Sequence, residues 1–127
     1  MNKSNILIVE DDAIHAFIAE AQLKEYYNTH WVDNGHEALK AIEKQKYEVI
    51  LMDINLNDPA MDGIKTMRTI RFNRKHRHTK IIALTAASDA REWFIKQGFD
   101  GHYMKPITVQ GLLEEINKEY TRTSLIY

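Results

Sequence analysis

The side chains best suited to chemistry in this sequence are acidic, and they occur as one acidic run and one distant aspartate. Glu10, Asp11 and Asp12 follow a short apolar run, and Asp53 follows a second one. Carboxylate oxygens without a cysteine or histidine pattern beside them favour a hard ion such as Mg²⁺. Because carboxylates gathered at one place repel each other, we expect Lys105 to join them as a positive charge.

An aspartate, Mg²⁺ and a lysine together suit phosphoryl transfer. The transition state of that reaction requires mainly positioning and the neutralisation of charge on three equatorial oxygens. A carboxylate nucleophile such as Asp53 would form an acyl phosphate. Thr85, which follows another apolar run, could donate a hydrogen bond to a phosphoryl oxygen once one is present. These residues predict a switch that is set by phosphorylation.

The elements that must position these residues alternate along the chain between apolar runs and segments of helical periodicity. This alternation predicts an α/β fold, a five-stranded parallel sheet that is doubly wound with five helices. We expect the strands at residues 5–10, 29–33, 48–53, 80–84 and 101–104. We expect the helices at residues 13–26, 35–46, 63–73, 89–97 and 109–120, with Gly98 as the C-cap of the fourth and Thr108 as the N-cap of the fifth.

The order of the strands decides whether the candidate residues meet. Right-handed crossovers leave few topologies, and the flavodoxin-like order 2-1-3-4-5 fits best, by analogy with known open sheets. In such sheets function lies at the carboxyl ends of the strands, near the point where the strand order reverses. Glu10, Asp53, Thr85 and Lys105 follow or close the first, third, fourth and fifth strands. We therefore expect one pocket that contains all four.

The bulk composition is that of a single globular domain. The chain has 127 residues, of which 44% are hydrophobic and 28% charged, with no cysteine and a formal net charge of -1. These values exclude disulfides and thiolate zinc sites, and they predict no general attraction to nucleic acid or to a membrane surface. No apolar run approaches the ~20 residues of a membrane span, and residues 1–4 do not make a signal peptide. We expect a cytoplasmic protein.

The most basic stretch, residues 71–80, falls at the end of the third expected helix. We expect a solvated helix end that the helix dipole favours, and a docking patch for an acidic partner stays open as the alternative. No interleaved aromatic residues or reading helix accompany this stretch, so nucleic-acid binding is not expected.

Five motifs, in order along the chain, resemble those of the response-regulator receiver domains of two-component signalling. They are Ile-Leu-Ile-Val-Glu10-Asp11-Asp12, Val-Ile-Leu-Met-Asp53-Ile-Asn55, Met61-Asp62-Gly63, Leu84-Thr85-Ala86 and Lys105-Pro106. Each motif stands at the end of an expected strand or at the start of the next helix. The resemblance covers essentially the whole chain, with residues 1–121 expected as the receiver domain and residues 122–127 as a C-terminal tail.

The resemblance implies the roles of the acidic residues. Asp53 would accept a phosphoryl group from the phosphohistidine of a histidine kinase or a phosphotransfer domain. Asp11 and Asp53 would bind Mg²⁺ directly, and Glu10 would bind it through water. Asn55 would contribute its backbone carbonyl. Asp12 receives no role from the resemblance.

The resemblance also implies roles for residues on the last two strands. Lys105 would pair with the phosphoryl oxygens across a cis Lys105-Pro106 peptide, and Thr85 would move toward those oxygens in the active state. Such a protein catalyses only its own phosphorylation and dephosphorylation and signals to a downstream protein, which the sequence does not identify. The chain could be free-standing or part of a larger protein such as a hybrid histidine kinase.

Three departures from the usual receiver pattern concern the response to phosphorylation. The spacing from Asp53 to Asp62 is two residues longer than the commonest one, so the loop beside the acceptor is enlarged. The spacing from Thr85 to Lys105 is two residues shorter, so the fourth helix or its leading loop is trimmed. His102 occupies the position of the family's switch aromatic residue. We expect intact phosphorylation chemistry with an altered readout.

Simpler structural roles compete with these assignments. The acids at residues 10–12 could cap the first helix, although one acid would suffice for that. Thr85 could equally be a helix N-cap, and Lys105 taken alone would be a solvated lysine.

Two other functions remain in competition with the phosphoacceptor. The first is a pseudo-receiver, a binding module without regulated phosphorylation, whose usual sign is loss of the acceptor, the acidic pair or the lysine. All of these are present here. The second is a phosphohydrolase of the haloacid dehalogenase type, but that family places Asp-x-Asp after its first strand, whereas Asp53-Ile-Asn55 follows the third.

Overall fold

Five parallel strands form one sheet in the order β2-β1-β3-β4-β5, which confirms the expected topology. The computed structural model describes residues 3–86 and 91–118. The strands are β1 (Ser4–Val9), β2 (Tyr27–Val32), β3 (Val49–Asp53), β4 (Lys80–Thr85) and β5 (Gly101–Met104). The helices are α1 (Ala13–Leu23), α2 (Gly35–Lys44), α3 (Gly63–Phe72), α4 (Arg91–Gln97) and α5 (Val109–Asn117), with a 3-10 turn η1 (Arg74–His76) after α3.

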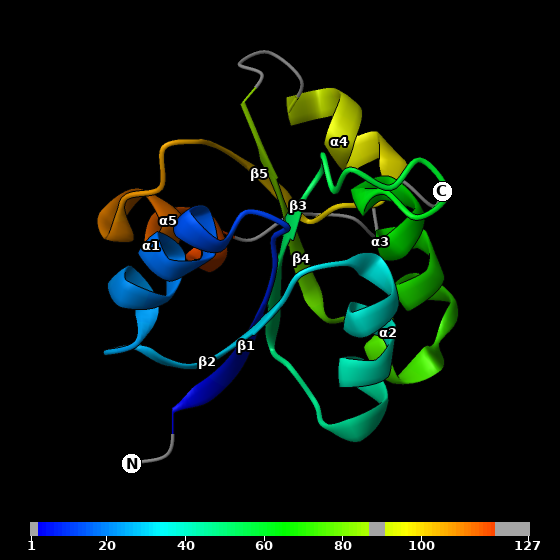
Figure 1. Cartoon of the computed structure of the whole chain (residues 1–127), viewed down its shortest axis with the longest axis horizontal. Coiled ribbons are helices and arrows are strands. Elements are labelled where there is room, and N and C mark those ends of the chain that lie inside the picture. Colours follow the sequence, from blue (N-terminus) through cyan, green and yellow to red (C-terminus); the bar gives the residue numbers. More distant parts are fainter. Residues whose placement is uncertain (1–2, 87–90, 119–127) are drawn as a thin grey trace.

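The helices cover both faces of the sheet. In Figure 1 the sheet is seen close to edge-on, with α1 and α5 on one side and α2, α3 and α4 on the other. Successive residues of β1 point to opposite faces, so Leu7 and Val9 join the core under α2 and α3 while Ile6 and Ile8 join the core under α1 and α5. Both faces are therefore buried, which explains why the central strands are continuously apolar.

The ends of several elements differ from the sequence-based expectation. α1 ends at Leu23 rather than at residue 26, because the chain turns there to enter β2 at Tyr27. The turn is closed by a hydrogen bond of 2.9 Å from the Tyr26 N–H to the Leu23 carbonyl. α5 ends at Asn117, since Lys118 has an extended backbone. Residues 89–90 and 119–120 of the expected helices, and the expected domain boundary after residue 121, lie outside the described residues.

Two expected helix caps are confirmed. Gly98 directly follows α4 with a φ of 124°, a backbone conformation that favours glycine. The Thr108 hydroxyl accepts a hydrogen bond from the Gly111 N–H at the start of α5. The expected shortening of the fourth helix or its leading loop stays a prediction, since residues 87–90, which precede α4, lie outside the described residues.

We expect a solvated helix end at residues 71–80, but part of this basic stretch is buried. Arg71 turns inward, pairs with the buried Asp100 and donates to the Thr79 carbonyl. His76 is also buried. A buried carboxylate requires a cationic partner, and this requirement overrides the preference of Arg71 for solvent.

In the parts of the chain that the structure describes, none of the helices combines the length and the apolar character needed to cross a membrane.

Candidate functional site

Four strand ends bring the expected residues together at one edge of the sheet. Asp53 closes β3 and Thr85 closes the neighbouring β4, while Glu10 directly follows β1 and Lys105 directly follows β5. They open onto one cavity of about 460 Å³. The cavity is lined by Glu10, Asp11, Asp12, His15, Asp53, Ile54, Asn55, Asn57, Thr85, Ala86 and Lys105. The pocket predicted from the sequence is therefore present.

Three carboxylates converge within this cavity. Oxygens of Glu10, Asp11 and Asp53 all lie within 4.8 Å of one another. Glu10 and Asp53 are buried, at 2% and 6% exposed, so water screens their charges poorly. Hard oxygen donors that meet in this way fit Mg²⁺, whose ligands in proteins are carboxylates, carbonyls and water.

The three consecutive acids at residues 10–12 have separate tasks. Asp12 is the N-cap of α1 and accepts hydrogen bonds from the Ile14 and His15 N–H groups at 2.9 and 3.1 Å. Glu10 and Asp11 point into the carboxylate cluster instead. One acid does suffice for the cap, and capping does not explain the other two.

Lys105 supplies the positive charge that the cluster requires. Its Nζ lies 2.7 Å from Oε1 of Glu10 and 3.7 Å from Oδ1 of Asp53. The side chain is 18% exposed, so Lys105 is not the solvated lysine that its sequence position alone would suggest. The Lys105-Pro106 peptide is cis, as the resemblance implied.

The proton affinities of the two buried acids are shifted in opposite directions. Burial raises the pKa of Asp53, the neighbouring Glu10 raises it further, and the pKa reaches about 7. Burial also opposes ionisation of Glu10, but hydrogen bonds with Asp53 and Lys105 outweigh burial and lower the pKa of Glu10. In the absence of a metal ion, Asp53 is therefore protonated below about pH 7 while Glu10 is ionised. A bound divalent cation would replace that proton.

The chain immediately after Asp53 returns close to this residue. The Asn55 N–H lies 3.4 Å from Oδ1 of Asp53, and the Gly63 N–H donates to the Ile54 carbonyl at 3.2 Å. A Cβ atom on Gly63 would lie 2.4 Å from the Asp53 carbonyl oxygen, so only glycine permits this close return. Asn55 lines the cavity where we expected it, and the ligand role of its carbonyl stays a prediction.

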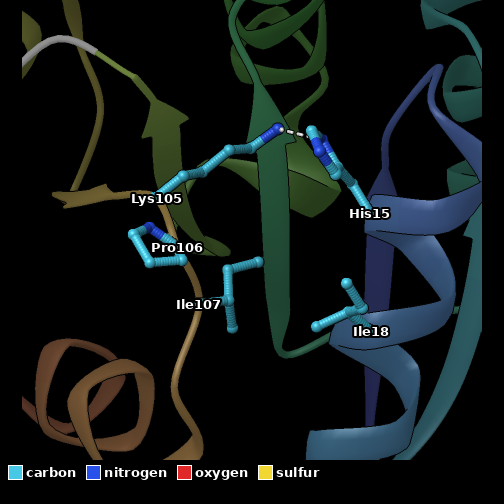
Figure 2. A pocket seen from close by; sticks show the side chains of 5 residues that line it. All are labelled: His15, Ile18, Lys105, Pro106 and Ile107. Carbon is cyan, nitrogen blue, oxygen red and sulfur yellow. Dashed lines mark hydrogen bonds between the residues drawn. The ribbon is translucent and has the colours of Figure 1, made fainter.

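The structure adds two residues that the sequence reasoning did not assign to the site. Asn57, from the enlarged loop, donates from Nδ2 to Oδ2 of Asp11 at 2.5 Å. His15, in the first turn of α1, places Nδ1 3.3 Å from Nζ of Lys105 (Figure 2). The unusual length of the loop between Asp53 and Asp62 indicated that a loop residue could reach the acidic side chains, but it did not reveal that this residue is Asn57. Nothing in the sequence indicates that His15 belongs to the site, since its spacing from other residues matches no metal-ligand pattern.

The two residues assigned to switching occupy different surroundings. Thr85 lines the cavity. His102 is not among the described residues that line it; its ring stacks on Phe94 of α4, with centroids 5.4 Å apart and an interplanar angle of 11°. The His102 backbone is held by Glu115 of α5, which accepts its N–H, and by Arg91 of α4, which donates to its carbonyl. A switching role for His102 stays a prediction, and it would act through α4.

The comparisons with known proteins agree with this geometry. Residues 6–117 match the sequence pattern of the family described as "Response regulator receiver domain". The chain is 30% identical to chemotaxis protein CheY-3 of Vibrio cholerae over 128 aligned residues, which cover 96% of each protein. It spans 7 to 15% of the length of the histidine kinases and sensor kinases among its curated relatives.

Two solved structures are informative about the site. The first is the receiver domain of a sensor histidine kinase of Pseudomonas aeruginosa, with a magnesium ion coordinated in its active-site cleft. It is 32% identical to this chain, with a TM-score of 0.78 and coverage of 91% of this chain and 99% of that one. The second is the co-crystal structure of the yeast histidine phosphotransfer protein Ypd1 and the receiver domain of Ssk1, matched at 26% identity and a TM-score of 0.78, over 89% of this chain and 86% of that one.

The strand order, the acidic cluster beside a lysine at the carboxyl ends of the strands, and the match over residues 6–117 lead to one conclusion. This chain belongs to the response regulator receiver domain family of two-component signalling.

Proposed function

We propose that this receiver domain is a phosphoacceptor switch, in which Asp53 takes a phosphoryl group from a phosphohistidine with the help of Mg²⁺. One observation carries the proposal. Asp53, Glu10 and Asp11 place carboxylate oxygens within 4.8 Å of one another, and Nζ of Lys105 lies 3.7 Å from Oδ1 of Asp53. A purely structural role would not require this many charges at one strand edge.

The reaction is a displacement at phosphorus. An ionised Asp53 oxygen forms the new O–P bond while the N–P bond of the donor breaks, and the electron pair of that bond stays on the imidazole nitrogen of the donor. Bound Mg²⁺ would withdraw charge from the phosphoryl oxygens and orient them. Glu10, Asp11 and Asp53 would hold the ion, with the Asn55 carbonyl beside them.

Lys105 is positioned to change partner during this reaction. In the unphosphorylated protein its ammonium group contacts Glu10 at 2.7 Å. A phosphoryl group on Asp53 would bring new anionic oxygens within reach of the same ammonium group, since Nζ is already 3.7 Å from Oδ1 of Asp53. Thr85, on the neighbouring strand, would then donate to another phosphoryl oxygen. The chain would catalyse only its own phosphorylation and dephosphorylation.

The donor proposed for this site is a histidine kinase or a histidine phosphotransfer protein. A protein donor must cover the mouth of the cavity, and α1, which carries the cavity residue His15, presents exposed apolar side chains. Ile14 and Phe17 are each 71% exposed and Ile18 is 42% exposed. Figure 2 shows Ile18 facing Ile107 across a hollow that adjoins Lys105. Exposed apolar surface next to a reactive site is typical of a docking face.

The two solved relatives support the cofactor and the partner class. One holds magnesium in its active-site cleft, and the other comes from a complex with a phosphotransfer protein. The proposal includes a cytoplasmic location, with which the absence of cysteine is compatible. The downstream protein that responds to phosphorylation is not part of the proposal.

Incubation with Mg²⁺ and acetyl phosphate tests the proposal. We expect the intact mass of the protein to rise by one phosphoryl group, and we expect Asp53→Asn to abolish the increase. Chelation of Mg²⁺ should also abolish it.

Two other outcomes would contradict the phosphoacceptor proposal. No adduct and no binding of beryllofluoride would favour a pseudo-receiver. Continuous turnover of phosphate esters would favour a hydrolase.

A further inference from the structure

The enlarged loop between β3 and α3 sends one side chain back to the acidic cluster. Asn57 donates a hydrogen bond from its side-chain amide to Oδ2 of Asp11, with 2.5 Å between the two atoms. Both residues line the cavity that contains Asp53. The contact joins residues 46 positions apart in the sequence, so it depends on how the loop is folded.

The loop is anchored on both sides of Asn57. Leu56, immediately before it, is 3% exposed and belongs to the core under α2 and α3. After it, Oδ1 of Asp58 accepts a hydrogen bond from the Ala60 N–H at 3.0 Å, and the Asp58 carbonyl accepts one from the Met61 N–H at 3.0 Å. These contacts fix the direction of the backbone at residue 57.

The backbone conformation of Asn57 is one that few residue types adopt. Its φ is 53°, the only positive φ at a non-glycine position in the described residues. Asparagine is strongly enriched in this left-handed region. Asparagine therefore meets two requirements here, a turn of the backbone and an amide donor for Asp11.

Asp11 has few other sources of support. Among the described residues, Lys105 forms ion pairs with Glu10 and Asp53, and no ion pair involves Asp11. Within residues 3–86 and 91–118, the Asn57 amide is also the one side-chain group that donates a hydrogen bond to the Asp11 carboxylate. A carboxylate oxygen has two lone pairs, so a bond to the amide fixes the carboxylate without occupying all of its acceptor sites.

We infer that Asn57 is a positioning residue of the metal site, which holds the Asp11 carboxylate in the orientation that binds Mg²⁺. The inference rests on the proposed Mg²⁺-dependent function. Hydrogen-bond donors behind metal-binding carboxylates commonly have this effect, and their loss weakens metal binding by roughly 10- to 100-fold.

Replacement of the amide without a change in backbone freedom tests the inference. Asn57→Gly removes the donor but keeps easy access to a positive φ. We expect this variant, unphosphorylated, to bind Mg²⁺ about tenfold more weakly than the unaltered chain by titration calorimetry. We expect the free energy of unfolding of the metal-free variant to match that of Ala60→Gly, which loosens the same loop without touching Asp11.

Two comparisons separate positioning from a general effect on the loop. Ala60→Gly should change the Mg²⁺ affinity by less than about twofold, since the amide of Asn57 is kept. In an Asp11→Asn background, Asn57→Gly should cause little further loss, because the two residues act as one unit.

Unchanged Mg²⁺ affinity of the Asn57→Gly variant would overturn the inference. Tighter Mg²⁺ binding would also overturn it, because it would show that the amide competes with the ion for Asp11. A full tenfold loss in the Asp11→Asn background, or an equal loss in Ala60→Gly, would overturn it as well. In those cases the proposed function would stand.

Normal Mg²⁺ binding without phosphorylation of Asp53 would overturn the proposed function and leave the role of Asn57 intact. No Mg²⁺ binding by the unaltered chain would overturn both.

Discussion

The Lys105 ammonium group lies 2.7 Å from a Glu10 carboxylate oxygen, although 95 residues separate the two in sequence. This ion pair closes the acidic cavity on the side of β5. It also keeps the ammonium group close to Asp53 before any phosphoryl group arrives.

Lys105→Met should impair phosphorylation while Mg²⁺ binding persists. The variant keeps an unbranched side chain but removes the charge that stabilises the phosphoryl oxygens, so we expect the rate with acetyl phosphate to fall at least about tenfold. Mg²⁺ affinity should hold or improve, because the ammonium group and the ion are both attracted to Glu10. Rates from intact-protein mass spectra and affinities from calorimetry provide the two readouts. An unchanged rate would count against the role of Lys105.

Asp11→Asn should weaken Mg²⁺ binding on the order of tenfold or more, because a hard anionic ligand becomes a neutral amide. Asp12→Asn is the matched control. It keeps the side-chain oxygen that caps α1, outside the ligand set, so its Mg²⁺ affinity should fall much less. Equal affinities of the Asp11→Asn variant and the unaltered protein in calorimetry would remove Asp11 from the metal site.

The raised pKa of Asp53 predicts how stability depends on pH in the metal-free protein. Its folded pKa of about 7 lies above the value of an unfolded aspartate, so the folded state binds the extra proton between these two values. The stabilisation is fully present below the unfolded pKa and is lost as the pH rises through about 7. Glu10, whose pKa is lowered, stays ionised above pH ~5 and does not contribute to this change.

Asp53→Asn has no proton to lose at this position, so it provides the comparison. Between pH ~5 and ~8, with a chelator present, the unaltered protein should lose about 2–3 kcal/mol of unfolding free energy relative to Asp53→Asn. Urea denaturation at each pH measures the difference. Parallel curves for the two proteins would show that Asp53 is already ionised at the acidic end.

Phe17→Ala should slow phosphotransfer from a protein donor but not from a small one. Phe17 is 71% exposed on α1, the helix that also carries the cavity residue His15, and a donor docked on α1 would bury it. We expect about a tenfold lower rate with a phosphorylated histidine phosphotransfer domain, the effect of losing one buried aromatic contact. The rate with acetyl phosphate should change by less than about twofold. Similar losses with both donors would show that Phe17 supports the fold instead of the docking face.

Phe72→Ala is the control for that experiment. Phe72 is 90% exposed at the end of α3, on the other face of the sheet. Its loss should alter neither rate. A large effect of Phe72→Ala on transfer from the protein donor would move the docking face away from α1.

The sheet was predictable because its central strands are buried on both faces and therefore read as unbroken apolar runs, as in residues 49–52. The residue at which α1 ends could not be predicted from the local sequence. Residues 24–26 continue a helical composition, and only the need to reach the start of β2 at Tyr27 ends the helix at Leu23. Tertiary connections of this kind override local propensity.

The candidate site was predictable to the extent that it lies at strand ends. Glu10, Asp53 and Lys105 each close or follow a strand, so the sheet order alone brings them together. Asn57 and His15 reach the site from a loop and a helix, and sequence does not reveal where such side chains point. The same limit explains why the inward turn of Arg71 was missed, since its partner Asp100 lies 29 residues away.

The site of phosphorylation is the most direct test of the central claim. An aspartyl phosphate formed with Mg²⁺ and acetyl phosphate can be reduced by borohydride to homoserine, and peptide mass spectrometry then locates the altered residue. We predict homoserine at residue 53 alone, in a Mg²⁺-dependent manner. Modification at another acid, or none at residue 53 under conditions in which the folded protein binds Mg²⁺, would contradict the proposal that Asp53 is the phosphoacceptor.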